Sequence, residues 1–240
     1  MRIDSRNLSF LIVALVAAAL FTRLGFWQMD RLAERRATNA LAETRLAAAP
    51  LDPATAARLP ADSLPWRRAA LVGRYDLERE IVVRARFSGG TPGAELLTPL
   101  LPAGEPETGA RILVLRGWLP SADGVRVDLS AGSPRVTGPI RGVIHAGSEP
   151  RPEVRHPTIE IDGSPHTVMM GIDLEAAAAS LPYPIADYYV RVVGPFDEPG
   201  QLRPPRAPTL DDGPHLMYAI QWFCFALIAL VGTWFYLRKA

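Results

Sequence analysis

Two long runs of apolar residues, one at each end of the chain, constrain this protein most. Neither Leu8–Thr22 nor Leu216–Leu237 contains a charged residue. The second run, about 22 residues at about 1.5 Å per residue, matches the roughly 30 Å hydrocarbon core of a bilayer. Arg238 and Lys239 follow it directly, as expected where a helix leaves the membrane. The sequence therefore predicts a membrane protein with one helix near each end.

The first apolar run is shorter, about 15 residues or ~22 Å, so a spanning helix must continue past Arg23. Trp27 and Gln28 extend the apolar segment, and a tryptophan is common at a membrane interface. This gives a predicted membrane helix over 8–28. The alternative is a cleaved signal peptide, with basic residues before the apolar stretch and an Ala-rich cleavage site at 17–19.

The segment between the two helices, 29–214, is predicted to be a mainly β extramembrane domain of the α+β class. Alanine, arginine and glutamate in 29–49 predict that the first helix continues out of the membrane, and the prolines of 200–214 predict a linker into a second membrane helix over 215–237. A short helix is expected at 173–181, after an N-terminal aspartate. Several strand-like runs separated by glycine and proline favour a small antiparallel barrel or curled sheet. The runs are 69–75, 80–87, 95–100, 111–118, 136–145, 167–172 and 188–193.

Composition excludes several kinds of site. A net charge of +1 gives no general case for nucleic acid as a partner. The single cysteine, Cys224, lies in the second apolar run, so the domain has no disulfide, cysteine-ligated zinc or thiol nucleophile. A copper site at His166, Met169 and Met170 is disfavoured because alternate strand residues face opposite ways. No nucleotide-binding, metalloprotease or serine-hydrolase motif is present, so the protein is predicted not to be an enzyme.

Three segments carry a resemblance to a known family. They are Leu24–Arg31 (LGFWQMDR), Leu115–Pro120 (LRGWLP) and His215–Phe223 (HLMYAIQWF). In this order they resemble the LGxWQxxR, RGWxP and HxxYAxxWF motifs of the Surfeit locus protein 1 family of cytochrome c oxidase assembly factors. Weaker matches are Gly73-Arg74-Tyr75 and Gly93 followed by Thr98-Pro99-Leu100. The family usually has a lysine shortly after the first motif, where this chain has Arg35 or Arg36.

The resemblance implies a role in respiratory chain biogenesis, as a chaperone that assists heme a insertion or retention in oxidase subunit I. It implies a bacterial member in the cell inner membrane, with both termini cytoplasmic and the domain periplasmic. Subunit I, other oxidase assembly factors and the lipid bilayer are the partners it implies. The alternative is a structural docking protein for oxidase subunits that binds no cofactor.

The candidate cofactor-binding residues lie at the predicted outer ends of the two helices. His215, Tyr218 and Trp222 share one helix face, and an imidazole can ligate heme iron while aromatic rings pack on a porphyrin. His215 is thus the hypothetical iron ligand. Trp27 and Gln28 are expected to line the same pocket, and Arg31 to meet a heme propionate. The alternatives for the six are a helix cap at His215, an aromatic interface belt, helix packing and headgroup contacts.

Two further expectations concern packing. Small residues are predicted to let the two helices approach closely: Ala14, Ala18 and Gly25 on the first, and Ala219, Ala226 and Ala229 on the second. At the end of the strand predicted over 111–118, Trp118 and Pro120 either pack inside the domain or form an exposed edge that touches the oxidase.

Overall fold

The computed structural model describes residues 5–132, 139–148, 156–193, 202–205 and 209–239. The chain divides into two compact units. The helix pair comprises residues up to 41 and from 209 onward, and the β domain comprises residues 42–208. Each unit is described by itself below.

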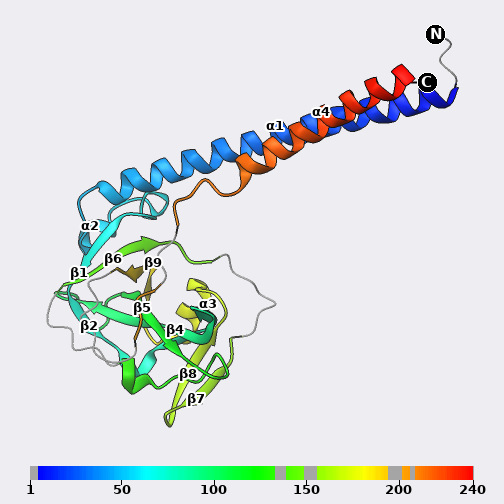
Figure 1. Cartoon of the computed structure of the whole chain (residues 1–240). Helices are drawn as coiled ribbons and strands as arrows, with labels where there is room; N and C mark the ends of the chain where they lie inside the picture. Colours follow the sequence, from blue (N-terminus) through cyan, green and yellow to red (C-terminus); the bar gives the residue numbers. More distant parts are fainter. Residues whose placement is uncertain (1–4, 133–138, 149–155, 194–201, 206–208, 240) are drawn as a thin grey trace. The chain divides into compact units, whose positions relative to one another are not determined.

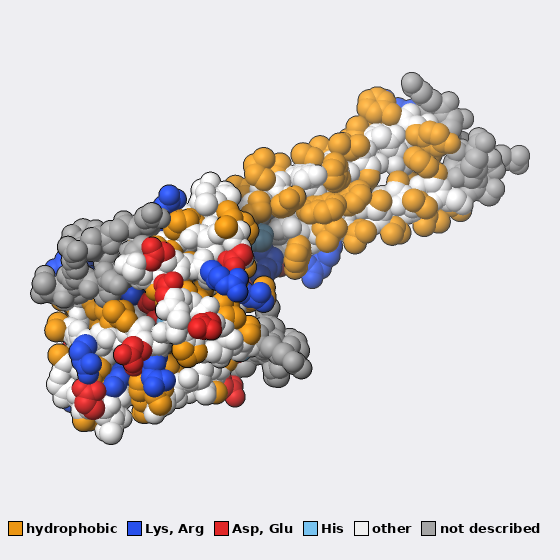
Figure 2. All heavy atoms as spheres, turned by 90° about the horizontal axis from the view of Figure 1, so that it is seen from below, with side chains coloured by type: hydrophobic (Ala, Val, Ile, Leu, Met, Phe, Trp, Pro, Cys, Tyr) orange, Lys and Arg blue, Asp and Glu red, His pale blue; other side chains and the backbone are white. Residues whose placement is uncertain are grey.

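The helix pair contains the two long helices, α1 (Ser5–Ala47) and α4 (His215–Lys239). Each is long and apolar enough to cross a membrane. They lie side by side and antiparallel (Figure 1), and hydrophobic side chains are the main coloured group on the visible surface of the pair (Figure 2). The prediction of a membrane helix near each end is confirmed, as is the continuation of the first helix well beyond residue 28.

A narrow seam of buried residues joins α1 to α4. Its members recur at separations of three, four or seven positions, the spacing at which two helices pack along a shared stripe. They are Ala18, Gly25, Gln28, Leu32 and Asn39 on α1, and Ala219, Ala226 and Thr233 on α4. Close approach of small residues is confirmed at Ala18, Gly25, Ala219 and Ala226, whereas Ala14 and Ala229 are half-buried.

Gly25 marks a point of close approach between the two helices. A Cβ atom at this position would lie 2.5 Å from Cε1 of the Phe223 ring, well inside van der Waals contact. On the same stretch, Phe21 stacks on Trp222 with ring centroids 5.7 Å apart. Aromatic rings of α4 thus fill the space beside a glycine of α1.

The β domain is built on one mixed sheet of nine strands. Its order is β1-β6-β9-β5-β4-β3-β8-β7, with β2 pairing β4. Two short helices, α2 (Pro53–Ala56) and α3 (Leu174–Ser180), accompany the sheet. The strands are β1 (Arg68–Leu71), β2 (Gly73–Tyr75), β3 (Ile81–Ser88), β4 (Thr91–Pro102), β5 (Arg111–Pro120), β6 (Ile140–His145), β7 (Thr158–Ile161), β8 (Ser164–Met169) and β9 (Ile185–Val192).

The prediction of a mainly β domain is confirmed. Of the two expected forms, an antiparallel barrel or a curled sheet, the closed antiparallel barrel is not formed by the described residues, because the sheet is open and mixed. The path of the sheet runs from β1 to β7, and within the described residues no ladder joins these two edges. The pairs β3–β8 and β5–β9 are parallel. The reason lies in α3, because a helix between β8 and β9 lets the chain cross over and return in the same direction. The helix itself was predicted, and Asp173 caps it by accepting a hydrogen bond from the Ala176 amide at 3.0 Å.

Element boundaries differ from the sequence prediction at several places. β7 and α2 were not predicted, and β4 begins at Thr91, inside a segment expected to be a loop. Strand β6 begins at Ile140, and residues 136–138 of the predicted strand lie outside the described residues. Nearly every residue of β4 and β5 is buried, so both faces of these central strands are covered.

The end of β5 is packed inside the domain. Trp118 is only 3% exposed, and its ring lies where a Cβ on Gly93 would stand 2.5 Å away. The alternative of an exposed docking edge at Trp118 is therefore wrong. Part of the predicted linker also belongs to this packing, because Arg203 exchanges two backbone hydrogen bonds with Trp118 at 2.8 and 2.9 Å. Residues 200, 201 and 206–208 of the linker lie outside the described residues.

Candidate functional site

The first candidate site lies on the helix pair, where the last motif meets the first. The His215 ring, at the start of α4, places Nδ1 2.9 Å from the Gln28 side-chain oxygen Oε1. Gln28 is 9% exposed and belongs to the seam, one turn from Gly25. His215 precedes the seam residue Ala219 by four positions, so its side chain lies on the α1-facing side of α4. The structure thus joins two residues that are 187 positions apart in sequence.

The other four candidate residues are placed differently. Trp222 is half-buried against Phe21, whereas Tyr218 and Trp27 are 48% and 46% exposed on the outer surface of the pair. Arg31 is exposed and forms an ion pair with Glu34 on its own helix. Of the three residues expected to share one face of α4, His215 and Trp222 are half-buried and Tyr218 is exposed.

A polar anchor, formed by Arg35, Arg36 and Asn39 of α1, holds the turn that precedes His215. Arg36 donates to one carboxylate oxygen of Asp212 from Nε at 2.9 Å and from Nη2 at 2.7 Å. Arg35 and Asn39 donate to the backbone oxygen of Asp211 at 3.0 and 2.9 Å. The two hydrogen bonds that Arg36 donates lower the pKa of the Asp212 carboxyl, so this carboxylate stays charged. The anchor fixes where α4 begins.

A second group of polar residues, the Arg116 cluster, lies inside the β domain. Arg116 Nη1 donates to Glu80 Oε1 at 2.7 Å, and both side chains are almost fully buried. The Thr98 hydroxyl donates to the same carboxylate oxygen, and the Arg116 guanidinium lies 5.1 Å from the centre of the Tyr75 ring. His166 Nδ1 lies 2.8 Å from the backbone oxygen of Glu80. Burial raises the pKa of the Glu80 carboxyl, and the Arg116 charge opposes that shift.

The Arg116 cluster explains the weaker sequence matches. Tyr75, Thr98 and Arg116 belong to three separate motif segments; Thr98 and Arg116 donate to Glu80, and the Tyr75 ring faces Arg116. Sequence reasoning missed Glu80. The available signal was Arg116 itself, since a charged residue within a continuous apolar strand requires a buried partner. In the described part of the chain no group of three or more His, Cys, Asp or Glu side chains is arranged to hold a metal ion. His166 and Met169 are buried residues of β8, whereas Met170 lies beyond the end of β8 and is 52% exposed.

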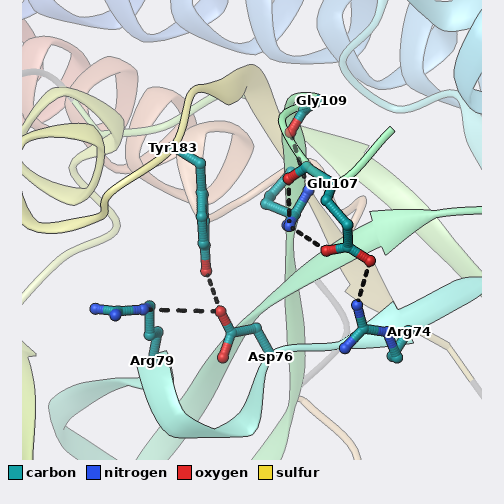
Figure 3. A network of polar contacts seen from close by, with 7 residues as sticks. Arg74, Asp76, Arg79, Glu107, Gly109 and Tyr183 are labelled. Carbon is teal, nitrogen blue, oxygen red and sulfur yellow. Dashed lines mark hydrogen bonds and ion pairs between the residues drawn. The ribbon is translucent and has the colours of Figure 1, made fainter. Parts of the chain in front are cut away.

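Figure 3 shows a further polar network that ties three turns of the β domain together. The Tyr183 hydroxyl donates to Asp76 at 2.7 Å, and Arg74 pairs with Glu107 at 2.6 Å. Arg111 donates to the backbone oxygens of Glu107 and Gly109 at 2.9 and 3.0 Å. Burial and the bond to Asp76 raise the pKa of the Tyr183 hydroxyl. Three arginines, Arg74, Arg79 and Arg111, pair here with two carboxylates, Asp76 and Glu107, and these contacts cross-link the segments that carry them.

The ring of His145 lies between two aromatic side chains of the β domain. Its ring stacks on Tyr189 at 5.5 Å and meets the edge of Trp66 at 5.4 Å. Burial, with a smaller contribution from the Arg191 charge, lowers the pKa of His145 to about 4. A ring kept neutral between two aromatic side chains is a packing element.

Comparison with known proteins agrees with the motifs. The model of the SURF1 family matches residues 15–227. A SURF1-like protein of Mycobacterium tuberculosis and one of Mycobacterium bovis are each 29% identical over 234 residues, which cover 95% of this chain and 83% of the relative. A SURF1-like protein of Rickettsia felis is 25% identical over 235 residues, 95% of this chain and 96% of the relative. Because the family model covers most of the chain, the protein belongs to the SURF1 family, the Surfeit locus protein 1 family of oxidase assembly factors that its motifs resemble.

Proposed function

We propose that this protein is an assembly factor for heme-copper cytochrome c oxidase that helps to insert or retain heme a in subunit I. In this proposal the chain is not an enzyme. It acts as a chaperone in respiratory chain biogenesis, and its partners are subunit I and other oxidase assembly factors. Membership of the SURF1 family supports the oxidase role. The heme step is supported by the residues at the start of α4.

The observation that carries the proposal is the held imidazole of His215. Its Nδ1 is engaged by Gln28 at 2.9 Å, so Nε2 is the nitrogen left for an incoming ligand. Heme iron in proteins is commonly held by one nitrogen of a histidine whose other nitrogen is hydrogen-bonded. The pair also lies at a suitable depth, because the helix from Leu8 to Gln28 spans about 30 Å, the thickness of the hydrocarbon core.

The surrounding side chains fit a porphyrin laid against the outside of the helix pair. One turn from Gln28 along α1, the Phe223 ring fills the space beside Gly25, so a flat ligand has no space between the helices at the level of Gly25. Tyr218 and Trp27 expose aromatic surface instead, and Arg31 is an exposed cation near the same end of α1. When bound, heme a would supply an iron that accepts the His215 nitrogen, an apolar ring for the aromatic side chains and propionates for the arginine.

The proposed location is the inner membrane of a bacterium, with both termini cytoplasmic and the β domain periplasmic. The two apolar helices support membrane insertion. With this topology the Gln28–His215 pair stands at the periplasmic boundary of the bilayer.

The test is pigment analysis of the purified protein. The full chain is co-expressed with the enzymes that make heme a and purified in detergent. Its absorption spectrum is then recorded. We expect heme a to co-purify with the wild type and to be lost in His215→Asn. His215 is the first residue of α4, and asparagine keeps a polar side chain at this position while removing the imidazole. Met217→Leu, at a position that is 69% exposed on the same turn, is the matched control and should keep the pigment.

A wild type that carries no heme a under these conditions contradicts the heme step. The docking alternative then applies, in which the exposed apolar face of the helix pair binds oxidase subunits without a cofactor. Normal heme a content in His215→Asn removes His215 as the ligand.

A further inference from the structure

The side-chain amide of Gln28 is buried among apolar neighbours. Gly25 and Leu32 flank it on the seam of α1, and Ala219 of α4 is only 1% exposed. A buried side-chain amide needs a hydrogen-bond partner, because burying it unpaired in an apolar environment costs substantial free energy. The partner present is the His215 ring, whose Nδ1 lies 2.9 Å from Gln28 Oε1.

With the amide oxygen of Gln28 facing the ring, as the structure places it, this hydrogen bond fits one tautomer of the neutral ring. A side-chain amide oxygen can only accept, so Nδ1 must carry the hydrogen that it donates to Gln28. A neutral imidazole has one hydrogen on its two nitrogens, so Nε2 then has a free lone pair. If the amide were turned by half a rotation, its NH₂ group would donate to Nδ1 and the ring hydrogen would move to Nε2, where it would block ligation.

The polar anchor keeps the ring in place along the helix axis. Arg36 holds Asp212, and Asn39 holds the backbone of Asp211, within the turn that leads into His215. The first intrahelical hydrogen bond of α4 runs from the Tyr218 amide to the Pro214 oxygen at 3.1 Å. The start of α4 is therefore held both by the polar anchor and by its own first hydrogen bond. The backbone of His215 has little freedom to move relative to Gln28.

We propose that Gln28 is a positioning residue that fixes His215 as the Nδ1–H tautomer and aims its Nε2 lone pair at an incoming iron. This inference rests on the proposed function for the identity of the ligand. In it, Gln28 of the first motif acts through His215 of the third motif. A hydrogen bond of this kind makes the ligating nitrogen more basic and orients the ring, and its loss commonly costs 10- to 100-fold in affinity.

The first experiment measures the tautomer without any heme. The full chain is labelled with ¹⁵N-histidine, held in detergent at a pH where the rings are neutral, and the His215 signals are assigned by their absence in His215→Asn. We expect the Nδ1–H form in the wild type and a shift toward Nε2–H in Gln28→Leu. Met29→Leu, which changes an exposed neighbour on α1, should leave the signals unchanged. An Nε2–H ring in the wild type, or an unchanged ring in Gln28→Leu, overturns the inference.

The second experiment titrates the purified variants with heme a. Gln28→Leu should bind heme a at least about tenfold more weakly than the wild type, because it removes the hydrogen bond that orients the iron-ligating ring. Gln28→Glu offers an anionic acceptor, so it should bind heme a and lower the reduction midpoint potential of the bound iron. Equal affinity and equal potential in all three proteins would overturn the inference. If the wild type binds no heme a, the proposed function fails, while the tautomer measurement still decides the role of Gln28.

Discussion

At the scale of single residues, the informative positions are polar side chains in apolar surroundings. Arg116 stands within a strand whose other residues are almost all buried, and Gln28 stands within a membrane helix. The sequence could indicate that each needs a partner, because an isolated buried polar group is costly. It could not identify Glu80 or His215 as those partners, since the chain between each pair folds through several other elements.

Replacing Arg116 by alanine should strongly destabilise the β domain. Glu80 would keep its hydrogen bond from the Thr98 hydroxyl but lose its cationic partner in a dry interior, and breaking a buried pair from one side costs about 3–5 kcal/mol. Urea unfolding of the full chain, followed by tryptophan fluorescence, measures the loss. Because burial raises the pKa of Glu80, its carboxylate becomes protonated and neutral as the pH falls. The loss of stability caused by Arg116→Ala should therefore be smaller at lower pH.

Two variants bracket this result. Arg126→Ala removes a solvent-exposed ion pair with Asp123 and should cost no more than about 1 kcal/mol. Glu80→Leu combined with Arg116→Leu removes both charges and should be more stable than Arg116→Ala. Equal stability of Arg116→Ala and Arg126→Ala would show that the buried pair contributes nothing.

At the scale of elements, the two membrane helices were predictable because an uninterrupted apolar run has few alternatives. Their seam was partly predictable, since small residues at helical spacing mark it at Ala18, Gly25, Ala219 and Ala226. The sheet was harder. Runs of strand residues gave most of the strands, but parallel pairing of β3 with β8 and of β5 with β9 depends on contacts between distant segments. Local patterns carry no information on such pairing.

Gly25→Leu should separate the helices at the level of Phe223. The new side chain would overlap the ring, and overpacking of a tight contact typically costs about 1–3 kcal/mol. Thermal unfolding of the detergent-solubilised protein should show a lower midpoint, and Phe223→Ala in the same chain should recover part of the loss. Gly232→Leu is the matched control, because a Cβ there meets nothing within 4 Å. Equal midpoints for Gly25→Leu and Gly232→Leu would contradict close packing at Gly25.

At the scale of the whole molecule, the sequence predicted a membrane-anchored β domain and the structure agrees. The side of the membrane was not decided by charge, because arginines follow the first helix as well as the second. Orientation is therefore a separate prediction. Reporter fusions at Pro150, a position outside the described residues, should be active only in an assay that reports periplasmic location. A cytoplasmic reporter that is active at this position contradicts the proposed topology.

The central claim is that the Gln28–His215 end of the helix pair serves heme a during oxidase assembly. The most direct measurement is oxidase activity, with heme a content, in membranes of a bacterium that lacks its own SURF1 protein and carries this chain or a variant. We predict that the wild type and the domain variant His145→Gln restore both quantities, whereas His215→Asn restores neither, at equal protein levels in the membrane. Full restoration of oxidase activity and heme a by His215→Asn would contradict the account.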